Sequence, residues 1–342
     1  MRKIIIHGVM MCALLIASCN KDETSPESSK HSEPSKQDYV ININTTRDAG
    51  NILSATSDSL ICVGNKKATR SGDILSSTEF MSPYVMLYLG GMFLASTVAN
   101  NSFVPIICKR TPISVSCSLP GTSREEIQSV ASSSYYMYLS EQIKAARFPE
   151  NSGYSINIGQ FTLYDELYPV LGNSNEYVAS LSRGKKQISQ KTGLYLLVSQ
   201  ESFKNIMDYP QGQDALIPAN KINEALYISS ISYGQATMVA LETNLSATEA
   251  YAMLKSIATK IFASNSTFLT SEEQHFAMSS DAASFILGGF PQGPTFLDAL
   301  VNMKNSKFSQ QNPGAPLYYT YNYVKDNSSF SMFYRLNVNY AK

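Results

Sequence analysis

The sequence contains no tryptophan and only three histidines among its 342 residues. Two of these histidines, His31 and His275, lie beyond the N-terminal apolar segment. No Gly-x-Ser-x-Gly motif, phosphate-binding loop or dinucleotide fingerprint occurs. The lone carboxylates Asp73, Glu242 and Asp281 are better explained as solvated or structural groups than as catalytic ones. These absences argue against an enzyme, and the sequence predicts no cofactor.

An excess of charge of one sign is also lacking, because 27 basic residues balance 27 acidic ones. A nucleic-acid-binding protein usually carries a basic patch or stripe, so we expect no nucleic-acid partner. No Cys/His spacing typical of a metal site occurs, and the sequence predicts no metal centre.

The N-terminus resembles a bacterial lipoprotein leader. Arg2 and Lys3 precede an apolar stretch from Ile4 to Ala17, which is too short for a stop-transfer span. Small residues then lead into Cys19, as in a lipobox. The resemblance implies cleavage before Cys19 and lipidation of that residue; the alternative is an ordinary signal peptide that ends near a cysteine.

The residues after Cys19 predict where the protein lies and how it is attached. Lys21-Asp22-Glu23 is similar to a surface-export signal of Gram-negative lipoproteins. Residues 24–38 are polar and cannot bury enough surface to order themselves. We therefore expect a signal peptide over residues 1–18, a flexible tether over 19–38 and a folded body over 39–342. The predicted location is the outer membrane, lipid-anchored at the cell surface.

Three further cysteines lie in the predicted body, at Cys62, Cys108 and Cys117. Cys108 and Cys117 fall within a predicted long strand, Phe103 to Leu119, which would hold them ~30 Å apart and exclude a mutual disulfide. Free buried thiols are one outcome. A disulfide from Cys62 to either of the others is the alternative in an oxidising compartment.

Alternating apolar residues predict several strands. Residues 330–340 place aromatic and aliphatic side chains at every second position, and residues 317–324 do the same. Because a short polar segment joins the two runs, they predict a C-terminal β-hairpin. Residues 227–243 predict another long strand, with Gly234 in its interior.

Helical patterns alternate with these strands. Ser246-x-x-Glu249 is a capping box, followed by apolar residues at helical spacing. Residues 123–146 and 296–303 also predict helices. Long strands and helices in no regular βαβ order predict an α+β fold around a mainly antiparallel sheet.

Short motifs along the chain resemble the cholesterol-dependent, or thiol-activated, cytolysins. Ser229-Ser230-x-x-Tyr233-Gly234, two residues after Tyr227, matches a Ser-Ser-x-x-Tyr-Gly signature. Leu241-Glu242-Thr243 and a helix follow in the same order. The other matches are a basic strand ending in Leu-Pro-Gly at 119–121, Tyr164-x-Glu166, Leu287-Gly288-Gly289 and Lys-Asp-Asn-Ser at 325–328.

This resemblance implies a fold and a mechanism. The fold would be a bent, twisted, mainly antiparallel central sheet flanked by helical clusters. Copies would gather on a membrane, align edge to edge and convert two helical clusters into β-hairpins. The hairpins would close into a barrel, because an unpaired backbone N–H or C=O group is costly in lipid. Gly288 and Gly289 would form a hinge; the alternative is an ordinary tight turn. Tyr164, Glu166, Tyr227, Ser229, Ser230, Tyr233 and Gly234 would serve edge-strand pairing and oligomerisation.

Two departures from the family limit what is carried over. The family's C-terminal membrane-binding domain has a tryptophan-rich loop, whereas this sequence has no tryptophan and reaches its last residue, Lys342, about where that domain would begin. We therefore expect no cholesterol recognition. The regions expected to form hairpins, residues 173–199 and 264–285, alternate poorly and contain charged runs at 183–186 and 272–275. In addition, Ala282 replaces the aromatic residue that the family has before the two glycines.

Two functions remain after these comparisons of motifs. The first is a short cytolysin-like, pore-forming lipoprotein that acts on a lipid membrane as a homo-oligomer or with a related cytolysin-like chain. The second is a non-lytic surface lipoprotein that keeps the fold and serves binding or self-protection. The retained glycines and edge motifs favour the first, and the poor alternation favours the second.

Overall fold

The structure is a computed structural model, and it describes residues 38–45, 61–63, 66–68, 74–81, 87–149, 152–172, 175–262 and 268–340. The predicted signal peptide, Cys19 and almost all of the predicted tether lie outside these residues. Strands and helices alternate irregularly along the chain, and most strand pairs are antiparallel. The predicted α+β class is therefore confirmed.

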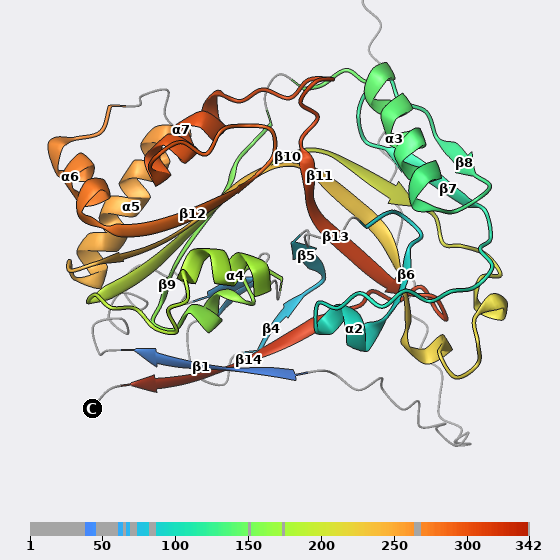
Figure 1. Ribbon diagram of the computed structural model, residues 1–342, viewed down its shortest axis with the longest axis horizontal. Helices are drawn as coiled ribbons and strands as arrows, with labels where there is room; N and C mark the ends of the chain where they lie inside the picture. Colours follow the sequence, from blue (N-terminus) through green and yellow to red (C-terminus); the bar gives the residue numbers. More distant parts are fainter. Residues whose placement is uncertain are drawn as a thin grey trace, which may run out of the picture. The chain divides into compact units, whose positions relative to one another are not determined.

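Two long strands, β10 (Thr192–Met207) and β11 (Ala225–Thr243), form the centre of a nine-stranded sheet. They pair antiparallel from Thr192↔Thr243 to Ile206↔Ser230. Every residue of β11 is buried. The predicted strand at 227–243 is thus confirmed, and Figure 1 shows the pair running through the whole sheet.

Shorter strands flank each half of this pair. The outer side of β10 is paired with β9 (Ser155–Phe161) in one half and with β7 (Ile113–Cys117) in the other. Along β11, β12 (Asp281–Leu287) occupies one half and β13 (Ala315–Tyr323) the other. The remaining strands of this sheet are β5 (Glu79–Met81), β6 (Met92–Leu94) and β8 (Glu125–Ile127).

Glycines mark the point where β13 gives way to β12. Pairing with β13 ends at Gly234↔Ala315, and pairing with β12 begins at Ala236↔Leu287. A Cβ on Gly234 would collide with the backbone carbonyl of Gln200, and a Cβ on Gly314 would lie 2.6 Å from the Gly234 oxygen. A β-bulge at Glu201/Phe203 lies opposite this point. The close backbone approach explains the glycine that the sequence places inside a long strand.

Alternate residues of β10 face two separate hydrophobic layers, as the period of a strand requires. Leu194, Leu196 and Val198 pack under three helices on one face. These helices are α5 (Ala247–Phe262), α6 (Ser271–Ser279) and α7 (Phe296–Asn305), which gather beside β12 in Figure 1. The capping box at Ser246 and the helix at 296–303 are both confirmed.

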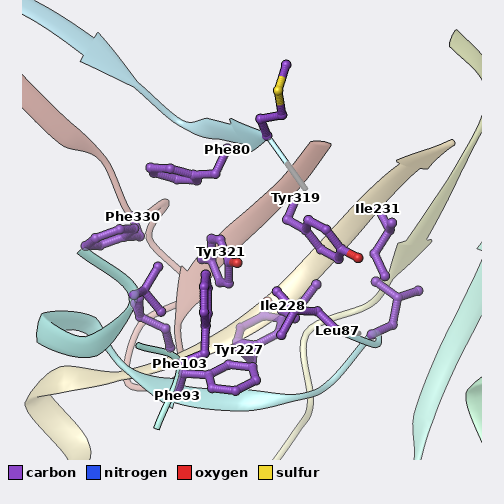
Figure 2. Close-up of a cluster of buried hydrophobic side chains, with 14 of the residues drawn as sticks. Phe80, Leu87, Phe93, Phe103, Tyr227, Ile228, Ile231, Tyr319, Tyr321 and Phe330 are labelled. Carbon is purple, nitrogen blue, oxygen red and sulfur yellow. The ribbon is translucent and has the colours of Figure 1, made fainter. Parts of the chain in front are cut away.

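The opposite face of the sheet carries the larger core, which includes Tyr195 and Leu197. It is covered by α3 (Ser132–Ala145), α4 (Asn175–Ser182) and the short α2 (Ala95–Ala99). Figure 2 shows its aromatic part, where Phe80, Tyr227, Tyr319, Tyr321 and Phe330 lie close together. No helix of the described residues is long and apolar enough to cross a membrane.

Three predicted elements are corrected by the structure. The C-terminal hairpin is wrong, because β14 (Met332–Tyr340) pairs with β1 (Asp38–Thr45) and β4 (Ile74–Ser77) in a second sheet. Alternation shows which residues share a face, but it does not identify the partner strand. The strand over 103–119 is regular only in β7. The helix over 123–146 is in fact β8 followed by α3.

A third, two-stranded sheet pairs β2 (Ile61–Val63) with β3 (Lys66–Ala68).

The close approach at Gly234 generates the first prediction. Gly234→Ala should lower the free energy of unfolding by about 2 kcal/mol, because the added methyl group forces β10 and β11 apart. Urea denaturation would measure this change. The control is Gly153→Ala, whose added Cβ would meet nothing within 4 Å. Equal midpoints for the two variants would contradict the packing described at this point.

Candidate assembly site: strands β9 to β12 and their helical linkers

Strands β9, β10, β11 and β12 form a four-stranded segment with two open edges. β9 pairs with β10 on one side, and β12 pairs with β11 on the other. Within the described part of the chain, no strand pairs with the outer edge of either one. Unpaired N–H and C=O groups along an edge strand are a template for pairing with another chain.

A helical linker joins each outer strand to its inner neighbour. Residues 162–191, about 30 in number, connect β9 to β10 and contain the 3-10 helix η1 (Tyr164–Leu167) and α4. Residues 244–280, about 37 in number, connect β11 to β12 and contain α5 and α6. Each linker therefore joins two antiparallel strands that are direct neighbours in the sheet.

The two linkers pack on opposite faces of this segment. From α4, Tyr177 stacks on Phe285 of β12 with ring centroids 4.4 Å apart, in the larger core. From α5, Leu254 and Ile257 pack in the other core, against β10 and β11. The sheet segment is therefore covered by one linker on each face.

A cluster of charged residues, here the Glu242 cluster, fastens the first linker to β11 and β12. The fully buried Glu242 accepts hydrogen bonds from Lys185 Nζ (2.9 Å), Tyr164 Oη (2.8 Å) and the backbone N–H of Ser189 (2.6 Å). Lys185 also donates to Asp281 Oδ2 at 2.8 Å, and Arg183 is ion-paired with the same carboxylate. Glu242 and Asp281 are direct cross-strand partners.

Burial by itself would raise the pKa of Glu242, but its hydrogen bonds outweigh burial. The bonds from Lys185 and Ser189 stabilise the ionised form and lower the pKa to about 2. The carboxylate is therefore ionised at neutral pH. This single carboxylate therefore binds three residues of the linker: Lys185, Ser189 and Tyr164.

A second set, here the Glu273 cluster, joins the two helices of the other linker. Glu273 on α6 accepts hydrogen bonds from Ser256 Oγ (2.6 Å) and Lys260 Nζ (2.7 Å), both on α5. It also caps its own helix by accepting from the N–H of Thr270 at 2.7 Å. Burial raises the pKa of Glu273, but the bonds from Lys260 and Ser256 lower it to about 2.

Glu166, at the start of the first linker, is buried, and no cation of the described residues pairs with it. Its carboxylate accepts hydrogen bonds from Thr162 Oγ1 (2.8 Å) and from the N–H groups of Thr162 and Leu163. Burial is the larger effect and raises the pKa of Glu166 to about 7, even though these bonds act to lower it. Glu166 therefore titrates near neutral pH beside the open edge of β9.

Comparison with known proteins relates this arrangement to one family. A model of the thiol-activated cytolysins matches residues 175–335, from α4 to β14. Tetanolysin from Clostridium tetani is 24% identical over 308 residues, which are 80% of this chain and 58% of tetanolysin. Pneumolysin from Streptococcus pneumoniae is 22% identical over 307 residues, which are 79% of this chain and 64% of pneumolysin. Over these residues the chain is similar to the thiol-activated cytolysins.

Solved structures of such toxins share the fold. The human-specific toxin intermedilysin superimposes with a TM-score of 0.63 at 18% identity, covering 78% of this chain and 63% of intermedilysin. Wild-type pneumolysin gives 0.62 at 16% identity, covering 77% and 63%. The cytolysin-like chain thus spans less than two thirds of the length of these relatives.

The structure separates the residues predicted for edge pairing into two groups. Tyr164 and Glu166 directly follow β9, an open-edged strand, and their role in assembly stays a prediction. Tyr227 and the motif Ser229 to Gly234 lie in β11, which β13 flanks on one side and β10 and β6 on the other. The prediction that this motif lies at an edge is wrong: burial of both faces and pairing on both sides place it in the middle of the sheet.

The remaining predicted residues lie as follows in the cytolysin-like chain. Gly288, with φ of +117°, and Gly289 end β12 where the chain leaves the sheet. Whether they act as a hinge stays a prediction. Cys108 and Cys117 are free thiols, and only the backbone of Cys62 is described, in β2. The described residues contain no group of three or more His, Cys, Asp or Glu residues placed to hold a metal ion.

Sequence reasoning assigned Glu242 and Asp281 a solvated or structural role but missed their partners. Arg183 and Lys185 belong to a charged run that reads as an exposed tip, yet both pair with Asp281, about 100 residues further along the chain. The available signal was Glu242 itself, a carboxylate inside a strand buried along its length, which requires a partner.

The Glu242 cluster generates the second prediction. Lys185→Met should lower the free energy of unfolding by about 2 kcal/mol, because it leaves a buried carboxylate without its cation; partial exposure of Lys185 keeps the loss below that of a fully buried pair. The control is Lys186→Met, at the exposed neighbouring lysine. Equal denaturation midpoints for the two variants would show that the pair does not fasten the linker.

Glu166 generates a third prediction, on pH dependence. Because its pKa is raised in the folded state, the folded protein binds more protons than the unfolded chain between pH 4.5 and 7. Stability should therefore fall as the pH rises through this window, by up to about 3 kcal/mol from this residue. Glu166→Gln should remove that part of the slope. Parallel stability profiles for wild type and variant would refute the assignment.

Proposed function

We propose that this chain is a lipid-anchored surface protein that assembles edge to edge on a target membrane and forms a pore, without catalysis and without cholesterol recognition. The observation that supports this most is the topology of the β9–β12 segment. Two open edges allow one copy to pair with the next, and two linkers can lengthen the sheet that results.

The position of the linkers supports hairpin formation. If residues 162–191 extend, they continue β9 and β10 as one antiparallel hairpin, and residues 244–280 do the same for β11 and β12. Half of either linker supplies at least about 15 residues, or about 50 Å at 3.3 Å per residue. A membrane-spanning strand needs about 9–11 residues, so both linkers are long enough.

The open edges support closure of the barrel. Hairpins in lipid are stable only when every strand has a neighbour on each side, so several copies must close a ring. The β12 edge of one copy and the β9 edge of the next supply that pairing. Partners are therefore further copies of this chain or a related cytolysin-like chain.

The N-terminal motif supports the location. Lipidation at Cys19 would attach the protein to the outer membrane, and the polar residues after it would leave the body free to move at the cell surface. The missing tryptophan supports recognition of the target by something other than a tryptophan-rich cholesterol loop.

A second function is favoured by the charge clusters. The Glu242 and Glu273 clusters hold both linkers in the helical arrangement, and an extended hairpin would break these ion pairs. A protein that keeps the fold without insertion, and serves binding or self-protection at the cell surface, is the alternative that this observation supports.

A fourth prediction tests assembly. β9 and β12 of one copy are three strand spacings apart, about 14 Å, so cysteines on them cannot form a disulfide within one chain. Asn157→Cys combined with Ala283→Cys should therefore give disulfide-linked multimers on vesicles, together with release of an enclosed dye. Ser155→Cys, two residues from Asn157 on the same face of β9, allows for a shifted register.

All variants carry Ser in place of Cys62, Cys108 and Cys117, and the controls are the two single-cysteine variants, which then can link no more than two copies. Multimers with dye release would support the pore. Multimers without release would overturn the pore in favour of the non-lytic function. Neither multimers nor release, in vesicles of phosphatidylcholine or of bacterial lipid, would overturn assembly as well.

A further inference from the structure

A groove of about 330 Å³ lies in the other half of the sheet, away from β9 and β12. Strands β5, β10, β11 and β13 and the turn before β14 contribute to its lining. Its lining includes Tyr209, Ser229, Ser230, Thr320, Asn322 and Asn327. Its size falls at the lower end of the range of small-molecule sites.

A β-bulge gives this groove its hydroxyl groups. The register of β11 against β13 shifts between Ile228 and Ser230. Successive residues of a regular strand face opposite sides, but here Ser229 and Ser230 both approach Thr320 Oγ1, at 2.9 and 2.7 Å. Both serines are more than nine-tenths buried, with 8% and 6% exposure. The bulge thus directs two adjacent side chains to one site.

The groove holds more hydrogen-bond acceptors than donors. Ser229 has one hydroxyl proton, yet Thr320 Oγ1, the Thr320 carbonyl and Asn322 Oδ1 all lie within 3.3 Å of its oxygen. The Asn322 amide nitrogen is already directed at two oxygens of Asn327. Ser230 and Thr320 supply two further hydroxyl protons for these contacts, and each hydroxyl oxygen keeps lone-pair capacity that a ligand donor can use.

The rest of the lining restricts those donors to uncharged groups. In the groove, Lys204 Nζ lies 3.3 Å from Glu79 Oε1, so this ion pair adds no net charge. The ammonium group of Lys204 also disfavours a cationic ligand. Beside the polar groups lie the ring of Tyr209, Met207 and the half-exposed Ile206. Hydroxyl donors on one side and a C–H face on the other describe a saccharide.

We propose that this groove binds a neutral saccharide unit of a surface glycan. The Ser229–Ser230–Thr320 hydroxyl cluster and Asn322 accept hydrogen bonds from sugar hydroxyls, and Tyr209 packs against the sugar ring. The proposal does not depend on pore formation, since none of these residues belongs to the linkers or to the open edges.

The test is saturation-transfer NMR with the full chain and four probes: glucose, galactose, mannose and N-acetylglucosamine. We expect at least one to bind with a Kd of about 1 mM, which corresponds to about −4 kcal/mol. Thr320→Val should weaken that binding about tenfold, because it removes the hydroxyl shared by both serines. The control is Thr237→Val, which makes the same change in the central sheet at a buried position outside the groove.

A second variant keeps the proposal falsifiable if Thr320→Val misfolds. Asn327 has a φ of +60°, which glycine tolerates, so Asn327→Gly removes the amide and leaves the turn intact. It should also weaken sugar binding, because the Asn327 side chain holds the amide of Asn322 in place. No binding of any probe to wild type, or equal binding in both groove variants and the control, would overturn the proposal. So would binding of phosphate or acetate in place of the sugars.

Discussion

The antiparallel pairing of β10 with β11 is the constraint on which the rest of the structure depends. These strands are 16 and 19 residues long and form the only pair that runs through both halves of the described sheet. Because β11 is buried along its whole length, each of its sides must be covered and each of its backbone groups paired. Shorter strands provide this pairing one after another. Along one side of β11, β13 pairs with the first half and β12 with the second; along the outer side of β10, β9 and β7 divide the strand in the same way. The glycines lie at the exchange because two backbones meet there with no room for a Cβ.

Local sequence patterns predicted the parts of the fold that depend on neighbours along the chain. The apolar run of β11, the capping box at Ser246 and the helix from Phe296 each follow from a few adjacent residues. Pairing between distant segments left no such signal. The C-terminal strand alternates as a hairpin arm should, yet only an isolated bridge, Asn322↔Ser329, joins the two segments before β14 turns away to β1 and β4. The edge position of the Ser-Ser-x-x-Tyr-Gly motif failed for the same reason, since one strand's sequence does not state how many neighbours it has.

In the candidate site, too, the sequence predicted features that depend on neighbouring residues but not contacts between distant segments. Tyr164 and Glu166 were found through a motif, and both lie beside an open strand edge. The residues that fasten the linkers were not found, because Lys185 and Asp281 read as separate exposed charges until folding brings them within 2.8 Å. The three buried carboxylates of this site differ in their pKa. Glu242 and Glu273 keep their charge because lysines and other donors approach them, whereas burial raises the pKa of Glu166 to about 7 and favours its protonated form below that pH. The linkers are thus held by charge in addition to apolar packing.

The free-energy cost of forming a membrane-spanning hairpin follows from the observed strand register. Phe161 pairs with Gly193, and continuing that register opposes Arg183 to Leu171 and Lys185 to Pro169, with the tip near Tyr177. Arg183 and Lys186 then lie six and nine residues from the tip, about 20–30 Å along the strand, on opposite faces of it. One of them faces lipid whichever way the hairpin turns, at a cost of about 2–4 kcal/mol per copy near the midplane. A ring built only from this chain repeats that cost at every position. If the proposed pore forms, alternating this chain with a relative whose arms are more regular would halve that cost, which would favour a mixed ring over a ring of identical copies.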